Sequence, residues 1–401
     1  MENQEFNRTL TLKSSIYLGL SSMIGAGLFN NIAPTSKISS YGTIIGLLIA
    51  SSLAFANASS SAQLSSLFPK TGGTYLYAKE VLGKPYGIAA GVVFVIGKTI
   101  SCIAIALTIG NYLSPVYGKE IGVVLCLLIF LLSFSGIHKT AEIARWFVWI
   151  LFGLLTFYSI SIISTPGVNY AIPVFSDVSF DNVLLSASIW FFAFTGYSRL
   201  ATFGEEVKNP KEIIPTAIFT GLGITVFLYL IISWLTLSVV SPEIIMNSST
   251  PLLVAMDVSR FSDFTFLVVF ASSIAMVSVF LALMPGISRI YVALSRDRIL
   301  PQAFSKIHKK FNSAYISEAF VLISVIIGIY IFDVVGSIKT SSFFILIYYT
   351  ITNLCVIKLN KEKRLYSVAI AYYGFAFCLV LAIALIAVSY THLTLPTTLP
   401  V

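Results

Sequence analysis

The sequence contains few charged residues, few histidines and few cysteines. Only 10% of its 401 residues are charged, whereas 57% are hydrophobic, and the mean hydropathy is +0.91. A water-soluble domain carries far more charge than this, so the composition excludes one. Apolar stretches of about 18 or more residues recur along the whole chain, which is the pattern of membrane-spanning helices.

The histidines and cysteines are not arranged for catalysis or metal binding. His138, His308 and His392 lie in predicted loops or the C-terminal tail, without a nucleophile–base pair or metal-ligand cluster. All four cysteines lie inside apolar spans without a CxxC pair, so we expect buried thiols rather than disulfides. They are Cys102, Cys126, Cys355 and Cys378. We predict that the protein is not an enzyme and holds no metal. A channel is disfavoured because nothing resembles a selectivity-filter repeat or a ring of charges.

We predict eleven membrane spans within one polytopic domain that covers residues 1–401. The spans are roughly 14–33, 42–66, 86–113, 120–136, 143–164, 184–204, 214–240, 264–294, 315–333, 338–357 and 366–390. Alternating sides from a cytoplasmic N-terminus leaves four Lys and Arg residues outside and three within spans. The former are Lys37, Lys119, Arg260 and Lys339, and the latter are Lys98, Arg199 and Arg289. The other eighteen are cytoplasmic, as the positive-inside rule requires. The net charge of +8 therefore indicates topology, not a nucleic-acid partner. We expect a multi-pass protein of the plasma (inner) membrane.

Two glycines interrupt the first span, in Ile24–Phe29 (IGAGLF). Each glycine costs a helix about 1 kcal/mol relative to alanine. A break inside the membrane also frees backbone groups that lipid cannot satisfy, so it survives where it lines a cavity or holds a ligand. The alternative is close helix packing through small residues.

The sixth span is interrupted in Phe192–Ser198 (FAFTGYS), where Gly196 is a weak point. Packing is again the alternative. The two breaks lie five spans apart, however, so their segments cross the membrane in opposite directions. Two interrupted helices in inverted positions are the best sequence indication of a secondary transporter with its site at mid-membrane.

Further motifs follow these breaks in a consistent order. They are Phe68–Tyr77 (FPKTGGTYLY), Gly83–Gly87 (GKPYG), Phe203–Pro210 (FGEEVKNP), Ile214–Ile218 (IPTAI), Ser288–Tyr291 (SRIY) and Ser295–Pro301 (SRDRILP). Together with IGAGLF they make the chain resemble the amino acid–polyamine–organocation (APC) superfamily of amino acid permeases over about residues 1–310. The resemblance implies an all-α integral membrane protein with the LeuT-like five-plus-five inverted repeat and discontinuous first and sixth helices. The repeats would cover about 14–164 and 184–357, followed by an extra helix at 366–390.

The chain also departs from the family pattern. Gln63 and Ser198 stand where the family usually or often has an acidic residue. The fifth span lacks the lysine that some proton-coupled relatives carry, which puts that coupling mechanism in doubt. Many members have twelve spans, whereas the tail at 391–401 is too short and too proline-interrupted to form one, so a twelfth helix is apparently missing.

The breaks and the resemblance together predict an amino acid site. The half-helix that begins near Gly27 would present free N–H groups and a positive dipole end to a carboxylate, while freed carbonyls would accept from an ammonium. Phe192 matches the family aromatic that closes over substrate, and Phe194 and Tyr197 are neighbours that could line the pocket; ordinary packing is the alternative for each. The predicted substrate-binding residues are Ile24, Gly25, Ala26, Gly27, Phe192, Ala193, Phe194, Thr195, Gly196 and Tyr197.

Charged residues within or beside the spans give further expectations. Lys98 is expected to snorkel toward the cytoplasm; alternatively it contacts substrate or carries a proton. Glu318 is expected at an interface that solvates it, and the absence of a mid-span carboxylate mildly favours neutral substrates. Arg199 and Arg289 are expected to anchor or gate the cytoplasmic ends. An inner-face ion network is predicted from Glu205, Glu206 and Lys208. We predict a symporter or exchanger with no cofactor beyond a proton or sodium ion; the alternative is a non-transporting sensor with the same fold.

Overall fold

The computed structural model describes residues 8–114, 116–134, 137–168, 170, 178–308, 311 and 313–394, with backbone alone at 137–140 and 387–394. Within these ranges the chain is helical and forms no β-sheet, with a single bridge between Leu10 and Val207. The helices are α1 (Leu12–Met23), α2 (Ala26–Ser39), α3 (Thr43–Leu67), α4 (Thr74–Val81), α5 (Lys84–Leu113), α6 (Gly118–Phe134), α7 (Ile137–Ile163), α8 (Phe180–Phe194), α9 (Pro210–Val239), α10 (Pro242–Ile245), α11 (Pro251–Asp257), α12 (Thr265–Arg296), α13 (Tyr315–Ile331), α14 (Val334–Lys358) and α15 (Val368–Thr394). Five 3₁₀ segments complete them: η1 (Ser40–Gly42), η2 (Thr195–Phe203), η3 (Ser262–Phe264), η4 (Gln302–Ser305) and η5 (Lys361–Lys363).

The helices confirm the predicted fold class. Eight stretches in the described ranges are long and apolar enough to cross a membrane. One of them, Leu12–Leu67, contains the two halves of the first predicted span and the whole of the second span. Helices α6 and α13 supply two shorter spans. Every span predicted from the sequence therefore has a helical counterpart. Helix α15 runs on to Thr394, and residues 395–401 of the predicted tail lie outside the described residues.

Helix ends follow local sequence signals. Thr11 caps α1 by accepting from the Ser14 N–H, and Asp333 caps α14 by accepting from the Gly336 N–H. Prolines stand in the first turns of α5 and α9, where a missing N–H costs nothing.

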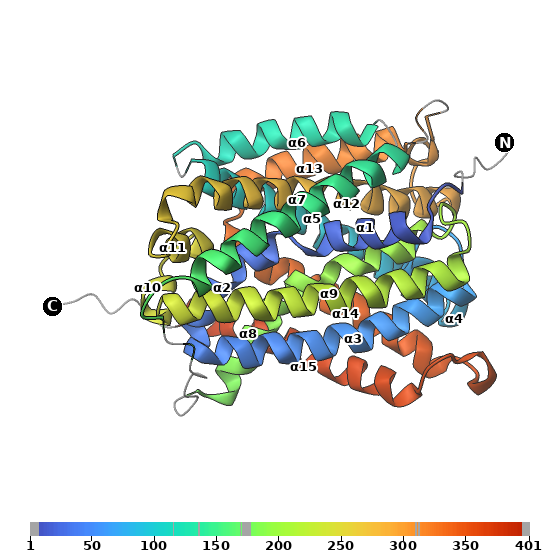
Figure 1. Ribbon diagram of the computed structural model, residues 1–401. Coiled ribbons are helices and arrows are strands. Elements are labelled where there is room, and N and C mark those ends of the chain that lie inside the picture. The colour runs from blue at the N-terminus through green and yellow to red at the C-terminus, as the bar shows by residue number, and fades with distance from the viewer. Residues whose placement is uncertain are drawn as a thin grey trace.

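The two discontinuous helices lie at the centre of the bundle. Figure 1 shows α1 and α2 end to end in the middle, with α6 along one edge and α15 along the other. In the most apolar stretch of α8–η2, 94% of the residues are buried inside the bundle. The corresponding share is only 33% in α7 and 33% in α15. The interrupted segments are thus shielded from lipid by α3, α5, α9, α12 and α14, as freed backbone groups require.

The bundle has two ends, which we name by the short helices there. Helix α4 lies at one end, and α10 and α11 lie at the other (Figure 1). Helix α1 starts at the α4 end, whereas α8 starts at the α10 end, so the two interrupted segments run in opposite directions, as predicted. The limits of the two repeats stay a prediction.

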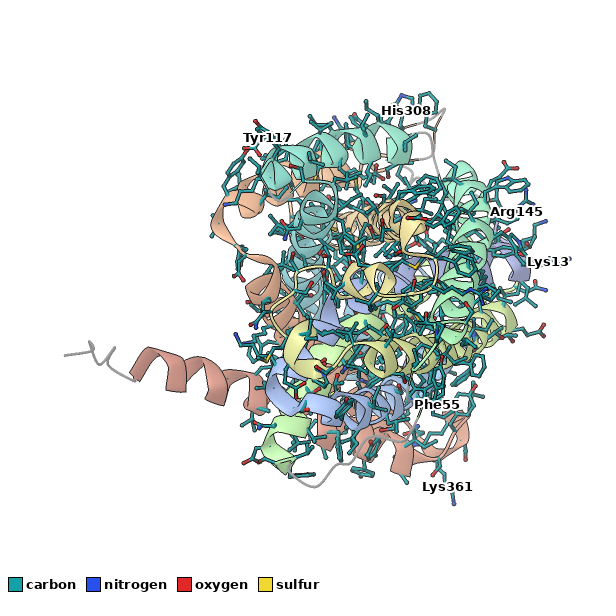
Figure 2. The ribbon with its side chains drawn as sticks, turned by 60° about the vertical axis from the view of Figure 1, so that its left-hand side comes forward. Lys13, Phe55, Tyr117, Arg145, His308 and Lys361 are labelled. Atoms are coloured by element: carbon teal, nitrogen blue, oxygen red, sulfur yellow. The ribbon has the colours of Figure 1, made fainter. Side chains whose placement is uncertain are left out.

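The outer surface between these ends is apolar. Side chains such as Phe55, Leu131, Phe227 and Ile331 are more than half exposed. Figure 2 shows Phe55 at the periphery of the bundle, where the labelled charged residues Arg145 and Lys361 also lie. A surface of this kind is stable when lipid covers it, which agrees with a multi-pass membrane protein.

Candidate functional site

The first break separates α1 from α2 at Ile24 and Gly25. Ile24 is extended, and Gly25 precedes the first turn of α2 without a side-chain cap. The first-turn N–H groups of a helix have no partner within it, so α2 presents such donors at Ala26 and Gly27. The break therefore produces the half-helix start that the sequence predicts.

Both glycines of this break allow close packing. A Cβ on Gly27 would lie 2.2 Å from the Ala193 Cβ and 2.4 Å from the Ala193 Cα. A Cβ on Gly25 would lie 2.3 Å from Val279 Cγ2. The packing interpretation of the glycine pair is therefore correct, and it holds together with the break rather than instead of it.

The second break changes the winding of the helix. Helix α8 ends at Phe194, and Thr195–Phe203 continue as the 3₁₀ segment η2. The Ser22 hydroxyl donates to the Gly196 carbonyl at 3.0 Å, and a Cβ on Gly196 would lie 2.1 Å from the Ser22 carbonyl oxygen. The two breaks are thus in direct contact, although they are some 170 residues apart in sequence.

Tyr229 of α9 connects the two breaks. Its hydroxyl lies 2.6 Å from the Met23 carbonyl and 3.4 Å from the Ala193 carbonyl, and it donates to them. Carbonyls freed by a break are costly in a dry interior, and this hydroxyl satisfies them. Tyr229 could not be predicted from the sequence, because nothing near it along the chain indicates its partners.

A small cavity lies between the breaks, with a volume of about 20 Å³. Of the predicted site residues, Ala26, Gly27, Phe192, Ala193, Thr195 and Gly196 line it. Ile24, Gly25, Phe194 and Tyr197 do not; Phe194 packs on Tyr229 and Tyr197 on Tyr349. The cavity is also lined by residues that were not predicted: Ser22, Met23, Ser101, Ile105, Val279 and Leu283. A volume that holds about one water means that the walls must separate before an amino acid can enter.

Lys98 does not snorkel to an interface, contrary to the expectation. It is 2% exposed, lines the cavity, and donates from Nζ to the Thr195 carbonyl at 2.7 Å. The correction has a physical reason: α5 packs against α12 and α14 inside the bundle, and the carbonyl freed at the second break is within reach. Arg199, expected to anchor or gate near an end, is also buried, four residues beyond Thr195.

The sequence motifs converge at the α4 end and close it. Asp297, after α12, accepts from the Tyr75 hydroxyl and pairs with Lys79 Nζ at 2.6 Å. Arg296 pairs with Glu205 at 3.2 Å, and the Glu205 carboxylate also accepts from the Thr71 N–H. Of the residues predicted to form an ion network, Glu205 therefore pairs with Arg296 of α12, and Glu206 pairs separately with Arg289. Lys208 forms none of the described ion pairs and is exposed.

A buried triad lies behind this network. Arg289 Nε is 2.9 Å from Glu206, and its Nη1 is 3.6 Å from Glu318; all three side chains are 1% exposed or less. Burial raises the pKa of the Glu206 carboxyl, although Arg289 acts to lower it. Glu318 is therefore not solvated at an interface, contrary to the expectation, because its carboxylate packs against Arg289 and accepts from Ser133.

Asp297→Asn is expected to weaken closure of the α4 end. Partial burial acts to raise the pKa of Asp297, but bonds from Lys79 and Tyr75 outweigh it and hold that pKa below its usual value. A carboxyl with a lowered pKa stays ionised until the pH falls through that value, so closure is expected to be constant around neutral pH. Losing a pair whose side chains are 30% and 31% exposed costs up to about 1 kcal/mol, which raises the population of the open state about fivefold.

Maleimide labelling of Ala201→Cys, whose carbonyl accepts from Tyr77, measures this opening. The four native cysteines are buried and give little background. Asp263→Asn, at the α10 end, is the matched control. Equal labelling rates in the Asp297 variant and the control would show that this pair does not hold the end closed.

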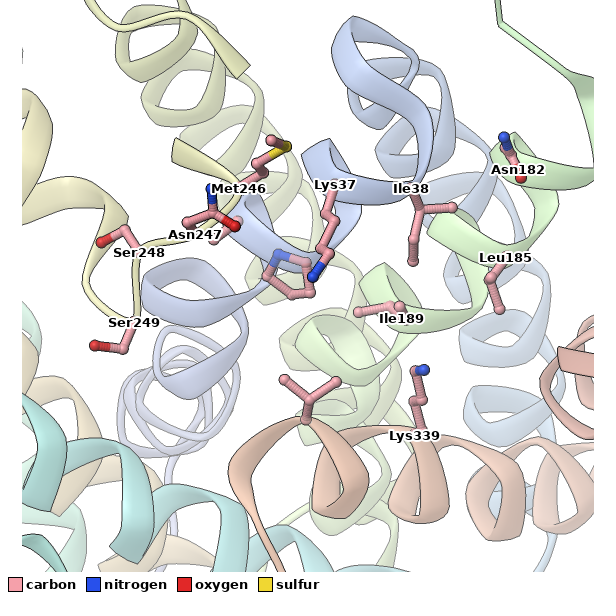
Figure 3. A pocket seen from close by; sticks show the side chains of 13 residues that line it. Lys37, Ile38, Asn182, Leu185, Ile189, Met246, Asn247, Ser248, Ser249 and Lys339 are labelled. Carbon is pink, nitrogen blue, oxygen red and sulfur yellow. The ribbon is translucent and has the colours of Figure 1, made fainter. Parts of the chain in front are cut away.

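A larger pocket opens at the α10 end, with a volume of about 810 Å³. It lies between the end of α2, the start of α8, the segment 246–249 and the start of α14. Figure 3 shows Lys37 and Lys339 extending into it from opposite sides, with Ile189 between them. Ile189 lies one turn from Phe192 on α8, so this pocket approaches the small cavity along one face of that helix.

Comparison with known proteins places this architecture in a family. The model of the amino acid permease family matches residues 15–401. The chain belongs to the amino acid permease family. This family member is 35% identical over 385 residues to an uncharacterised transporter of Mycobacterium tuberculosis, across 95% of the chain and 87% of that protein. It is 27% identical over 415 residues to the serine/threonine exchanger SteT of Bacillus subtilis, across 96% and 90%. It is 25% identical over 341 residues to the methylthioribose transporter of Bacillus subtilis, across 78% and 73%.

These relatives confirm the resemblance to the APC superfamily seen in the sequence. Their names indicate transport rather than enzymatic activity, and they differ in the substrates they mention. The substrate of this protein therefore has to be inferred from its own residues.

Proposed function

We propose that this protein is a secondary transporter that moves amino acids across the membrane by alternating access. The observation that carries the proposal is the meeting of two oppositely directed broken helices at one small buried cavity. The start of α2 offers N–H donors and a positive dipole end to the α-carboxylate. Carbonyls at the breaks offer acceptors to the α-ammonium, and Tyr229 holds some of them while the cavity is small.

The two ends of the bundle support the alternating-access part of the proposal. Ion pairs close the α4 end, whereas the pocket at the α10 end leads toward Phe192. Phe192 is 7% exposed and lines the cavity, a position from which its ring can cover a bound substrate. With the N-terminus in the cytoplasm of a plasma (inner) membrane, the α4 end faces inward and the structure opens outward.

We further propose that protons, rather than sodium ions, drive net uptake if the protein is a symporter. Lys98 already occupies the Thr195 carbonyl that a bound cation would use. Glu206 and Glu318 share one arginine, so a proton on either carboxyl neutralises the surplus negative charge of the triad.

Counterflow in proteoliposomes tests the transport proposal. Vesicles loaded with one unlabelled amino acid are expected to accumulate a labelled one with saturable kinetics, and a pH gradient rather than a sodium gradient is expected to drive net uptake. Ligand-induced thermal stabilisation without counterflow would favour the sensor. Uptake that does not saturate would indicate a channel.

A further inference from the structure

The buried charges of the described residues do not balance. Three cationic side chains are buried, Lys98, Arg199 and Arg289, against two carboxylates, Glu206 and Glu318. Both carboxylates contact Arg289. Lys98 and Arg199 are therefore left without a buried carboxylate in this part of the structure.

Arg199 has no hydrogen-bond partner at any of its three guanidinium nitrogens within the described residues, although it is 2% exposed. Its stem is fixed against α12, where a Cβ on Gly286 would lie 2.9 Å from Arg199 Cγ. Lys98 donates to the carbonyl of Thr195, which lies on the same 3₁₀ segment as Arg199 and four residues before it, so the two cations are neighbours at the second break. An ammonium has three donors and a guanidinium five, so the pair has unused donors.

Two neighbouring cations buried without a counter-charge are unfavourable in a dry interior. A bound anion removes that cost, and an amino acid site is where such an anion would enter. We propose that the substrate is an acidic amino acid whose side-chain carboxylate binds between Lys98 and Arg199 while its α-carboxylate lies at the start of α2. This inference rests on the proposed function and specifies its substrate class.

The pocket at the α10 end supports the same substrate class independently. Lys37 and Lys339 extend into it, Asn182 and Asn247 add amide donors, and the described residues that line it include no carboxylate (Figure 3). Glu243 lies in an adjoining hollow that also contains Lys37. A pocket lined by charge of one sign concentrates ligands of the opposite sign, so the route toward Phe192 favours an anionic substrate.

The inference replaces the preference for neutral substrates. That preference followed from the absence of a mid-span carboxylate. Without such a carboxylate a cationic substrate side chain has no partner, but substrates with neutral or acidic side chains both remain possible. The buried cations separate these two, because a neutral side chain would leave Arg199 unpaired. A cationic side chain would meet two like charges and is disfavoured further.

Counterflow with isosteric pairs tests the inference in chloride-free buffer. Labelled L-glutamate and L-aspartate are expected to exchange, whereas L-glutamine and L-asparagine are expected to compete at least about tenfold more weakly. In the variants Arg199→Gln and Lys98→Gln, the half-saturating concentration of the acidic substrate is expected to rise at least about tenfold. The half-saturating concentration of the corresponding amide is expected to stay the same or to fall. Arg145→Gln, at an exposed position on α7, is the matched control and is expected to behave as wild type.

The thermal midpoint of each purified variant accompanies these measurements. Arg199→Gln removes an unpaired buried charge, so its midpoint is expected to be no lower than that of wild type. If that variant fails to fold, the inference is tested by Lys98→Gln and by the competition of the amides with the acidic amino acids in the wild-type protein. Stabilisation by L-glutamate or L-aspartate that is lost in Lys98→Gln, without counterflow, would support the substrate class while the transport proposal fails.

Two results would overturn the inference while transport stands. In the first, neutral amino acids exchange and the acidic ones do not compete. In the second, exchange of a neutral amino acid requires added chloride, and Arg199→Gln abolishes that requirement. The second result would assign the anion between Lys98 and Arg199 to an inorganic ion.

Discussion

Replacement of Gly27 by alanine is expected to abolish saturable counterflow and to lower the thermal midpoint. The added Cβ would lie 2.2 Å from the Ala193 Cβ and 2.4 Å from its Cα. Carbon atoms in contact lie about 3.5–4.0 Å apart, so the start of α2 and the end of α8 would have to separate by roughly 1 Å or more. Backbone is involved on both sides, and overpacking of this kind typically costs about 1–3 kcal/mol.

The matched control is Gly223→Ala on α9, where an added Cβ meets no atom within 4 Å. That variant is expected to transport normally and to be as stable as wild type or more stable, by up to about 1 kcal/mol, because alanine favours the helix. A Gly27→Ala protein with normal counterflow and midpoint would show that close approach of the two half-helices is dispensable.

The sequence was sufficient to predict both breaks, because glycines inside apolar spans are local signals. It was also sufficient to predict the order of the spans, which follows from hydropathy. The motifs that converge at the α4 end were identified through the family resemblance. The bonds across the breaks were not predictable. Tyr229 bonds to Met23, which is 206 residues away, and nothing local to either residue encodes that pairing.

Charged residues near span ends were the least predictable. The position of Glu318 at the start of its span suggested a solvated interface, but Arg289 from α12 reaches it inside the bundle. The long side chain of Lys98 suggested snorkelling, but the Thr195 carbonyl captures its ammonium. In each case the partner comes from a distant helix, and helix packing rather than span position decides burial.

Replacement of Arg289 by methionine is expected to be the most destabilising change at a charged position. Arg289 contacts two buried carboxylates, at 2.9 Å to Glu206 and 3.6 Å to Glu318. Its removal leaves both without a cation in a dry site, and breaking a buried pair in this way typically costs about 3–5 kcal/mol. A large fall in the thermal midpoint, or failure to purify as a monodisperse species, is the expected result.

Two further variants separate charge from packing. Arg145→Met removes an arginine whose pair with Glu142 is exposed, at 45% and 58%, so its cost is expected to stay below about 1 kcal/mol. In the triple variant Arg289→Met, Glu206→Gln and Glu318→Gln all three charges of the triad are gone, so much of the lost midpoint is expected to return. If the triple variant is no more stable than Arg289→Met, the loss comes from the packing of the Arg289 side chain. The triad would then stabilise the α4 end by shape rather than by charge.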